Sequence, residues 1–248
     1  MLSAFGVTDK GRIRLSNEDC FAIHEQLGLA VVADGMGGHN AGEVAARMAV
    51  DAVVEYFSTA ESDWPFGFDP ALSPEGNRMR TAILLANAQI LESSITIDRY
   101  AGMGTTVVAM RVTGSQLVCG HVGDSRLYLL SRDGLRQITS DDSWVAAMLA
   151  SDPAANPELL RQHPMRHALT NVVGARTRTE AHVVETALEP GDVMLLTTDG
   201  VHEVIDDARL EQLLRKSSDP ATAAQSIAAM ALARETRDNL TAVVAIYS

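Results

Sequence analysis

The chain has 248 residues, 46% of them hydrophobic, which is enough for a sizeable core and excludes a disordered protein. A net charge of −12 argues against binding to nucleic acid or to anionic membranes, because basic patches drive both. No apolar stretch is long enough to cross a bilayer, and no basic region followed by an apolar segment begins the chain, so we expect a cytoplasmic protein.

The first part of the chain predicts strands and two amphipathic helices. Successive strands joined by turns as short as those after residues 112 and 122 are expected to pair antiparallel, because parallel pairing needs long crossovers. In chain order, these elements are expected at residues 1–7, 20–25, 29–33, 42–58, 77–94, 105–112, 116–122, 126–131 and 135–138. The apolar face of the first helix is expected to carry Val44, Met48, Ala49, Ala52, Val53 and Tyr56.

The rest of the chain begins with a mostly helical segment, broken by prolines, at 143–174, which we interpret as an excursion from the sheets. Strands are expected at 182–187 and 193–197, helices at 207–217 and 220–235, and a last strand at 241–247. No repeat and no low-complexity linker separates these elements. The order favours an α+β fold, with sheets packed together and helices outside, in a single domain over residues 1–248.

Acidic residues recur where predicted strands begin or end. They are Glu18 and Asp19, Asp34, Asp124, Asp199 and Asp238. Carboxylates at strand ends can meet at one rim of a sheet, where they would repel one another unless cations balanced their charge. All-oxygen ligands favour magnesium or manganese over zinc. Each Asp-Gly pair alone also fits an ordinary turn, but their recurrence at strand ends favours a site for two divalent cations.

Six motifs, spread over nearly the whole chain, resemble the PPM family of metal-dependent serine/threonine protein phosphatases, in its bacterial, type 2C-like branch. They are Arg14–Asp19, Ala33–His39, Gly104–Thr106, Gly123–Arg126, Thr198–Gly200 and Arg237–Thr241. The resemblance implies two central antiparallel sheets packed as a sandwich, with helix pairs on both outer faces. It also implies that 143–174 is a mobile flap beside the active site; a surface insertion is the alternative.

The resemblance implies roles for single residues. Asp34 would bridge two cations, with the Gly35 carbonyl helping to hold one of them. Asp199 and Asp238 would hold the other, and Glu18 would act on its neighbour largely through water. Asp19 and Asn239 would support these ligands from behind. Arg14 would bind the phosphate, because a planar guanidinium can bond two phosphate oxygens; from the residues alone it could also be a surface arginine.

The reaction implied by this resemblance is hydrolysis of phosphoserine and phosphothreonine on proteins. A water held between two cations would become a hydroxide and attack phosphorus directly. His39 is a candidate proton donor to the leaving oxygen. A third cation would be held by Asp124 and Asp199, with Glu203 reaching it through water, because relatives carry an aspartate at that last position.

The expected partners are phosphorylated proteins and a serine/threonine kinase that this monomeric enzyme opposes. The segment Trp64–Gly67 and the catalytic-only layout resemble phosphatases that oppose the kinase of bacterial type VI secretion. Other phosphatase chemistries fail on spacing: Arg126 stands one residue too far from Cys119 for a cysteine phosphatase. The serious alternative is a catalytically silent relative that binds phosphoproteins as a sensor or scaffold, although the expected ligand positions are all retained. His163 and His167 have helical metal spacing, but packing or flap contacts suit them better than zinc.

Overall fold

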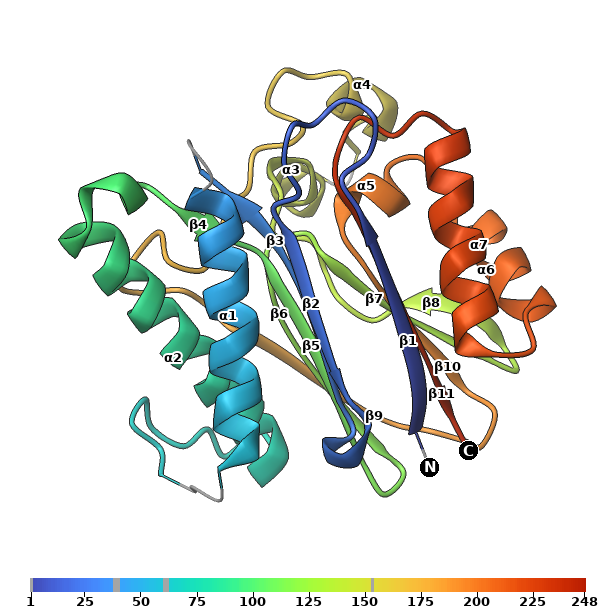
Figure 1. Cartoon of the computed structure of the whole chain (residues 1–248), viewed down its shortest axis with the longest axis horizontal. Coiled ribbons are helices and arrows are strands. Elements are labelled where there is room, and N and C mark those ends of the chain that lie inside the picture. Colours follow the sequence, from blue (N-terminus) through green and yellow to red (C-terminus); the bar gives the residue numbers. More distant parts are fainter. Residues whose placement is uncertain (1, 38–40, 60–62, 153) are drawn as a thin grey trace.

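The structure is a computed structural model that describes residues 2–37, 41–59, 63–152 and 154–248. Two antiparallel sheets stand face to face at the centre, and helices cover the outer face of each (Figure 1). This arrangement confirms the α+β sandwich expected from the order of elements.

One sheet contains both terminal strands. Its strand order is β1-β11-β10-β7-β8, and every neighbouring pair is antiparallel. The bounds are β1 Leu2–Asp9, β11 Leu240–Tyr247, β10 Val193–Thr197, β7 Arg126–Ser131 and β8 Gly134–Gln137. Near-continuous burial of β10 and β11 agrees with their uninterrupted apolar runs.

The other sheet has the order β2-β3-β5-β6-β9, with the short β4 paired to the end of β3. The bounds are β2 Asp19–His24, β3 Leu29–Met36, β4 Gly104–Thr105, β5 Val107–Thr113, β6 Gln116–Val122 and β9 His182–Ala187. A 3-10 turn, Glu25–Leu27, joins β2 to β3, where the sequence predicted a short connection between two strands.

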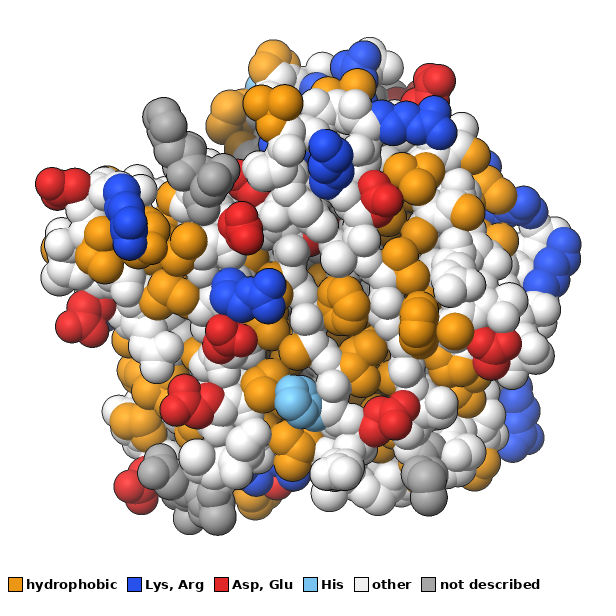
Figure 2. Space-filling model, in the orientation of Figure 1, with side chains coloured by type: hydrophobic (Ala, Val, Ile, Leu, Met, Phe, Trp, Pro, Cys, Tyr) orange, Lys and Arg blue, Asp and Glu red, His pale blue; other side chains and the backbone are white. Residues whose placement is uncertain are grey.

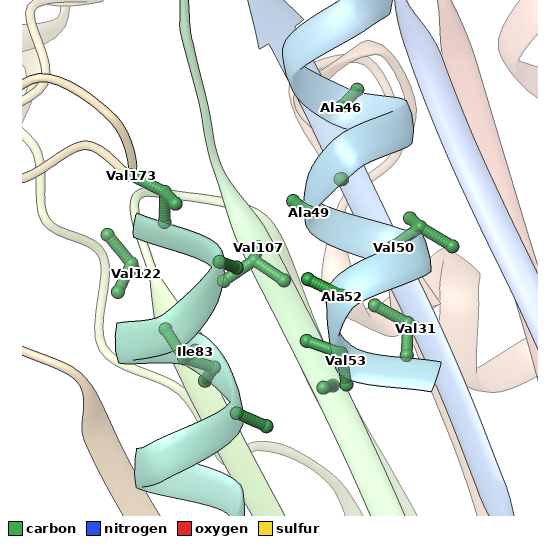
Figure 3. Close-up of a cluster of buried hydrophobic side chains, with 14 of the residues drawn as sticks. Val31, Ala46, Ala49, Val50, Ala52, Val53, Ile83, Val107, Val122 and Val173 are labelled. Carbon is green, nitrogen blue, oxygen red and sulfur yellow. The ribbon is translucent and has the colours of Figure 1, made fainter. Parts of the chain in front are cut away.

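Two long helices cover this second sheet: α1, Ala41–Ser58, and α2, Pro74–Thr96. Helix α2 begins three residues before the expected Asn77, because Ser73 caps it through the Gly76 N–H and Pro74 fits its first turn. Between the helices and the sheet lies a cluster of valines, alanines and isoleucines, including Ala49, Ile83 and Val107 (Figure 3).

The buried face of α1 differs from the prediction. Ala49, Ala52, Val53 and Tyr56 are buried as expected, but Val44 and Met48 are only half-buried. The burial instead extends to Ala45, Ala46, Val50 and Phe57. The helix packs on the sheet and on α2 at the same time, so its buried face is wider than a single apolar stripe and rotated from it.

Helices α6, Asp207–Lys216, and α7, Pro220–Ala233, cover the first sheet. The sheets themselves meet through a third cluster with side chains from both, such as Val32, Met110, Leu129 and Val243. A short helix that we did not predict, α5 Asp199–His202, follows β10 directly. Among the described residues, no helix is long and apolar enough to cross a membrane.

The prediction that 116–122 pairs with 126–131 is wrong. Strand β6 belongs to one sheet and β7 to the other, so the short link 123–125 carries the chain between the sheets. Hairpin and inter-sheet links can have the same length, and turn residues alone do not separate them. The link at the opposite end, 188–192, crosses back from β9 to β10.

The segment 143–174 leaves the sandwich as expected, but only part of it is helical. Helix α3 spans Trp144–Ser151 and α4 spans Pro157–Arg161. An isolated bridge between Ser143 and Leu169 closes this segment on itself, and a second bridge, between Thr105 and Val173, joins its end to the body. A 3-10 turn, Asp98–Tyr100, lies before β4.

Candidate functional site

The acidic residues found at strand ends converge at one end of the sandwich. Asp19 and Asp34 stand opposite each other in the β2–β3 pair. The charges of Asp19, Asp199, Asp124 and Asp238 all act on Asp34, so the carboxyl groups lie within electrostatic reach of one another. The expected meeting of strand ends at one rim is therefore present.

Asp34 and Asp199 are at the centre of this group. Burial, followed by the neighbouring carboxylates, raises the pKa of both side chains well above the usual range. One buried oxygen of Asp199, Oδ1, has no hydrogen-bond partner. Buried polar atoms are normally paired, so this oxygen marks a place that a cation can fill.

The backbone of Asp34 is fixed by Thr106, the residue directly after β4. The Thr106 N–H donates to the Asp34 carbonyl at 2.8 Å, and the Asp34 N–H donates to Thr106 Oγ1 at 3.0 Å. Thr106 Oγ1 also bonds Ser125 Oγ at 2.7 Å, beside Asp124. The Gly104–Thr106 motif thus connects two acidic strand ends.

Asp19 is buried behind this group and faces away from solvent. Its Oδ2 accepts hydrogen bonds from the hydroxyls of Thr241, at 2.7 Å, and Thr198, at 2.9 Å. Burial raises the pKa of Asp19 to about 7, although these two bonds oppose the rise. The two threonines were not predicted as site residues, because threonine in an apolar run reads only as a strand former.

Asn239, directly before β11, fastens both ends of the loop between β1 and β2. Its side-chain oxygen accepts from the Glu18 N–H at 2.8 Å, and its nitrogen donates to the carbonyls of Lys10 and Ser16. The Glu18 side chain approaches the start of α1 so closely that a Cβ on Gly42 would lie 2.3 Å from it. Only glycine at position 42 leaves space for Glu18 in this position.

Asp124 lies in the link between the sheets. Gly123, with φ of +95°, makes the turn, and a Cβ there would also collide with Thr106. Burial, with a contribution from Asp141, raises the pKa of Asp124 to about 7. Asp141 itself is held by Arg126 through two hydrogen bonds, of 2.9 and 2.6 Å.

Arg14 reaches the acidic group from the loop between β1 and β2. Its Nη2 bonds Asp238 Oδ2 at 2.5 Å, and half of its side chain remains exposed. Partial burial lowers its pKa, but the Asp238 carboxylate outweighs this and raises the value above the ordinary one. Arg14 is therefore paired with the acidic group and is not an isolated surface arginine.

The base of the 143–174 segment is tied to the sheets by Asp142, a residue that we did not predict. Its carboxylate accepts the Gly123 N–H at 3.0 Å and the Asn171 side chain at 2.9 Å, and it contacts His182 Nε2 at 3.0 Å. The His182 ring stacks on buried His121. These partners are distant in sequence, so the pattern gave no signal for them.

The histidines of the flap make contacts within the protein, as expected. The ring of His163 stacks on Trp144 with centroids 4.4 Å apart. His167 Nδ1 lies 2.9 Å from Glu203 Oε1, just after α5, and both side chains are about half exposed. Glu203 is thus in contact with the 143–174 segment. The candidate proton donor His39, with Gly38, lies outside the described residues.

The atoms that could bind a cation at this rim are mainly carboxylate oxygens, which suit hard divalent cations. Unpartnered buried oxygens on Asp199 and Asp19, together with the mutual repulsion of the carboxylates, support this fit. Among the described residues, no group of three or more acidic, histidine or cysteine side chains is drawn together as a ready-made metal cage. The carboxylates thus meet at one rim without closing around a point.

Comparison with known proteins agrees with the family resemblance of the sequence motifs. The family model described as "Protein phosphatase 2C" matches residues 12–236. The serine/threonine phosphatase stp of Listeria innocua is 33% identical over 216 residues, covering 84% of this chain and 81% of that protein. PstP of Mycobacterium tuberculosis is 32% identical over 96% of this chain, which spans 43% of PstP.

Solved structures share the architecture. The crystal structure of M. tuberculosis PstP/Ppp has a TM-score of 0.85 and 31% identity, and covers 100% of this chain and 99% of that one. The PstP catalytic domain in complex with two manganese ions has a TM-score of 0.82 and 30% identity over 99% of this chain and 97% of that one. PppA, a regulatory component of type VI secretion in Pseudomonas aeruginosa, scores 0.82 with 31% identity, over 99% of this chain and 97% of PppA.

Repulsion among the carboxylates predicts a gain in stability when one is neutralised. A carboxyl whose pKa is raised on folding binds more protons folded than unfolded, so its ionisation destabilises the fold as pH rises through that pKa. In the presence of a chelator, we expect Asp34→Asn to raise the melting temperature at pH 8 by roughly 2 °C or more, and by less at pH 5.5.

The matched control is Asp133→Asn, which changes an exposed aspartate in the β7–β8 turn. We expect it to leave the melting temperature nearly unchanged at both pH values. Equal melting temperatures for wild type and Asp34→Asn at pH 8 would contradict the repulsion. Calorimetry at each pH provides the measurement.

Proposed function

The chain belongs to the protein phosphatase 2C family, and we propose that the carboxylates gathered at one end of its sandwich, with Arg14, carry out metal-dependent hydrolysis of phosphoserine and phosphothreonine on proteins. The single observation that supports this assignment to the chain's own residues is the convergence of Asp19, Asp124, Asp199 and Asp238 on Asp34.

The cation ligands in this proposal are Asp34, Asp199, Asp238, Glu18 and the Gly35 carbonyl. Divalent cations held there would supply a water that loses its proton at neutral pH and would offset charge on the phosphoryl oxygens. Asp34 is suited to a bridging position because the charges of Asp19, Asp199, Asp124 and Asp238 all act on it.

Supporting residues keep these ligands in position. Asp19 orders the hydroxyls of Thr198, one residue before Asp199, and of Thr241, three residues after Asp238. Asn239 holds Glu18 through its backbone N–H. Neither residue needs to touch a cation for its loss to displace a ligand.

Arg14 binds the phosphate in this proposal. A guanidinium can donate two parallel hydrogen bonds to phosphate oxygens, which fixes both position and orientation. Its half-exposed side chain and its location at the edge of the acidic group leave one face available to a substrate. The Asp238 carboxylate orients it from behind.

A third cation remains part of the proposal, held chiefly by Asp124 and Asp199. Asp124 is in electrostatic contact with both Asp199 and Glu203. Glu203 is one methylene longer than the aspartate of relatives and already contacts His167 of the flap. These features favour contact with the cation through water, since magnesium requires near-ideal octahedral geometry.

The partners follow from the activity: phosphorylated proteins are substrates of this enzyme. Four further points stay predictions: a cognate serine/threonine kinase, a monomeric state, a cytoplasmic location and a single domain over 1–248. The likeness to PppA supports the type VI secretion hypothesis, but PstP and PppA have the same identity of 31%.

The experiment that tests the function is manganese-dependent hydrolysis of p-nitrophenyl phosphate and of a phosphothreonine peptide. We expect turnover by the wild type and loss of turnover in Asp34→Asn and Asp199→Asn, because each removes an ionised ligand. Calorimetry should show weakened manganese binding in both folded variants. A wild type that binds the peptide without turnover would indicate the silent sensor or scaffold instead, and full activity in either variant would contradict the ligand assignment.

Arg14→Ala should act on substrate binding. We expect a higher Michaelis constant for phosphopeptides, with metal affinity little changed. A charge-assisted hydrogen bond contributes ~1.5–3 kcal/mol, so kcat/KM should fall roughly ten- to hundredfold. The control variant is Arg12→Ala, which removes an exposed positive charge two residues from Arg14 and leaves the proposed phosphate contact intact. An Arg14→Ala enzyme with wild-type kcat/KM would show that this guanidinium does not bind phosphate.

Asp124→Ala should lower the turnover of phosphopeptides while calorimetry still detects the two central cations. Glu203→Gln should have a smaller effect, because Glu203 acts through water and already contacts His167. Steady-state kinetics at saturating and limiting magnesium would compare the two variants. Wild-type turnover by Asp124→Ala, or a larger loss in Glu203→Gln, would contradict this arrangement.

A further inference from the structure

The loop between β1 and β2 exposes two large apolar side chains beside the candidate active site. Leu15 is 97% exposed and Ile13 is 66% exposed. Single exposed hydrophobic residues are ordinary on protein surfaces. These two differ because they are the immediate neighbours of Arg14, the proposed phosphate-binding residue.

The exposure does not come from a loosely attached segment. The carbonyls at both ends of the loop, on Lys10 and Ser16, accept hydrogen bonds of 3.0 and 2.9 Å from the same Asn239 side chain. Asp9 Oδ1 accepts the Gly11 N–H at 2.8 Å, and Asn17 donates to Thr8 at 2.8 Å. The ends of the loop are therefore fixed, and its tip, 12–15, projects from them.

Within this tip, the side chains have different partners. The Arg14 guanidinium turns to Asp238 and the acidic group. Ile13 and Leu15 are exposed instead of joining any of the three hydrophobic clusters of the core. Neighbouring Cα atoms are ~3.8 Å apart in any chain. A peptide whose phosphorylated residue meets Arg14 thus brings its adjacent residues to within reach of Ile13 and Leu15.

The charge of the loop suits such a peptide. Lys10 and Arg12 are exposed and form no ion pair with a described residue, while the chain as a whole carries −12. Basic and hydrophobic side chains lie together near the top of the face in Figure 2, the part of the molecule where this loop runs beside α3 and α4 in Figure 1. A phosphopeptide is anionic, so it is attracted here although most of the surface repels it.

We propose that Ile13 and Leu15 are specificity-determining residues that receive apolar side chains on either side of the phosphorylated residue of the substrate. The inference rests on the proposed function, in particular on Arg14 as the phosphate ligand. The occupant is one kind of partner: a phosphorylated protein segment with hydrophobic residues flanking its phosphothreonine or phosphoserine. Contact would remove apolar surface from water on both chains.

The test compares two phosphothreonine peptides that differ only in the residues flanking the phosphothreonine, leucine in one and serine in the other. For the wild type we expect kcat/KM to favour the leucine peptide by about tenfold, from partial burial of two apolar pairs. In the double variant Ile13→Ser, Leu15→Ser this ratio should fall close to one. The ratio is internally controlled, because damage to the catalytic machinery would lower both values alike.

Two further variants complete the design. The conservative pair Ile13→Val, Leu15→Met should keep the preference, since hydrophobic surface is retained. The control pair Ile95→Ser, Ile97→Ser changes two exposed apolar residues at the end of α2, 73% and 38% exposed, and should keep it as well.

Three results would overturn the inference: a wild type without preference, a preference that survives in Ile13→Ser, Leu15→Ser, or its loss in the α2 control pair. Turnover of either peptide by the wild type would still support the phosphatase function. Absence of all turnover would contradict the function itself, so the two failures are distinguishable.

Discussion

Repulsion among carboxylates buried at one end of the sandwich is the constraint on which the rest of the structure depends. Burial and mutual charge raise the pKa values of Asp19, Asp34, Asp124 and Asp199 together, so the folded protein holds these groups at a cost. On Asp19, hydrogen bonds from Thr198 and Thr241 offset part of the unfavourable free energy of burying the carboxylate. Divalent cations would offset the remainder, which makes metal binding and folding stability a single linked property.

The scaffold meets this constraint with rigid connections and small residues. Gly42 leaves space for Glu18, and Gly123 allows the turn before Asp124. Asn239 fastens both ends of the β1–β2 loop, next to Glu18. The proposed carboxylate ligands Glu18, Asp34, Asp199 and Asp238 come from or adjoin different strands, so displacement of one strand would move only one of these carboxylates. The arrangement explains why the motifs are short and far apart: each supplies one strand end and the residues that fix it.

Most of the fold could be predicted from the sequence because strand periodicity and turn residues are local signals. The pairing of 116–122 with 126–131 was wrong, since the length of a link does not reveal whether it stays within one sheet. The meeting of acidic residues at one rim was predictable because the ends of strands can be located from the sequence. The contacts of Asp142 were not predictable, because its partners Gly123, Asn171 and His182 are brought together only by the fold.

The chain crosses between the two sheets at both ends of the sandwich, through 123–125 near the acidic group and through 188–192 at the far end. A sandwich fastened at opposite ends cannot splay like a hinge to admit a larger ligand. Adaptation to the surfaces of protein substrates is then expected in segments outside the sheets, such as 143–174 and the β1–β2 loop. Over evolutionary time, the side chains of these segments can change and the enzyme can accept new substrates, while the acidic strand ends remain in place.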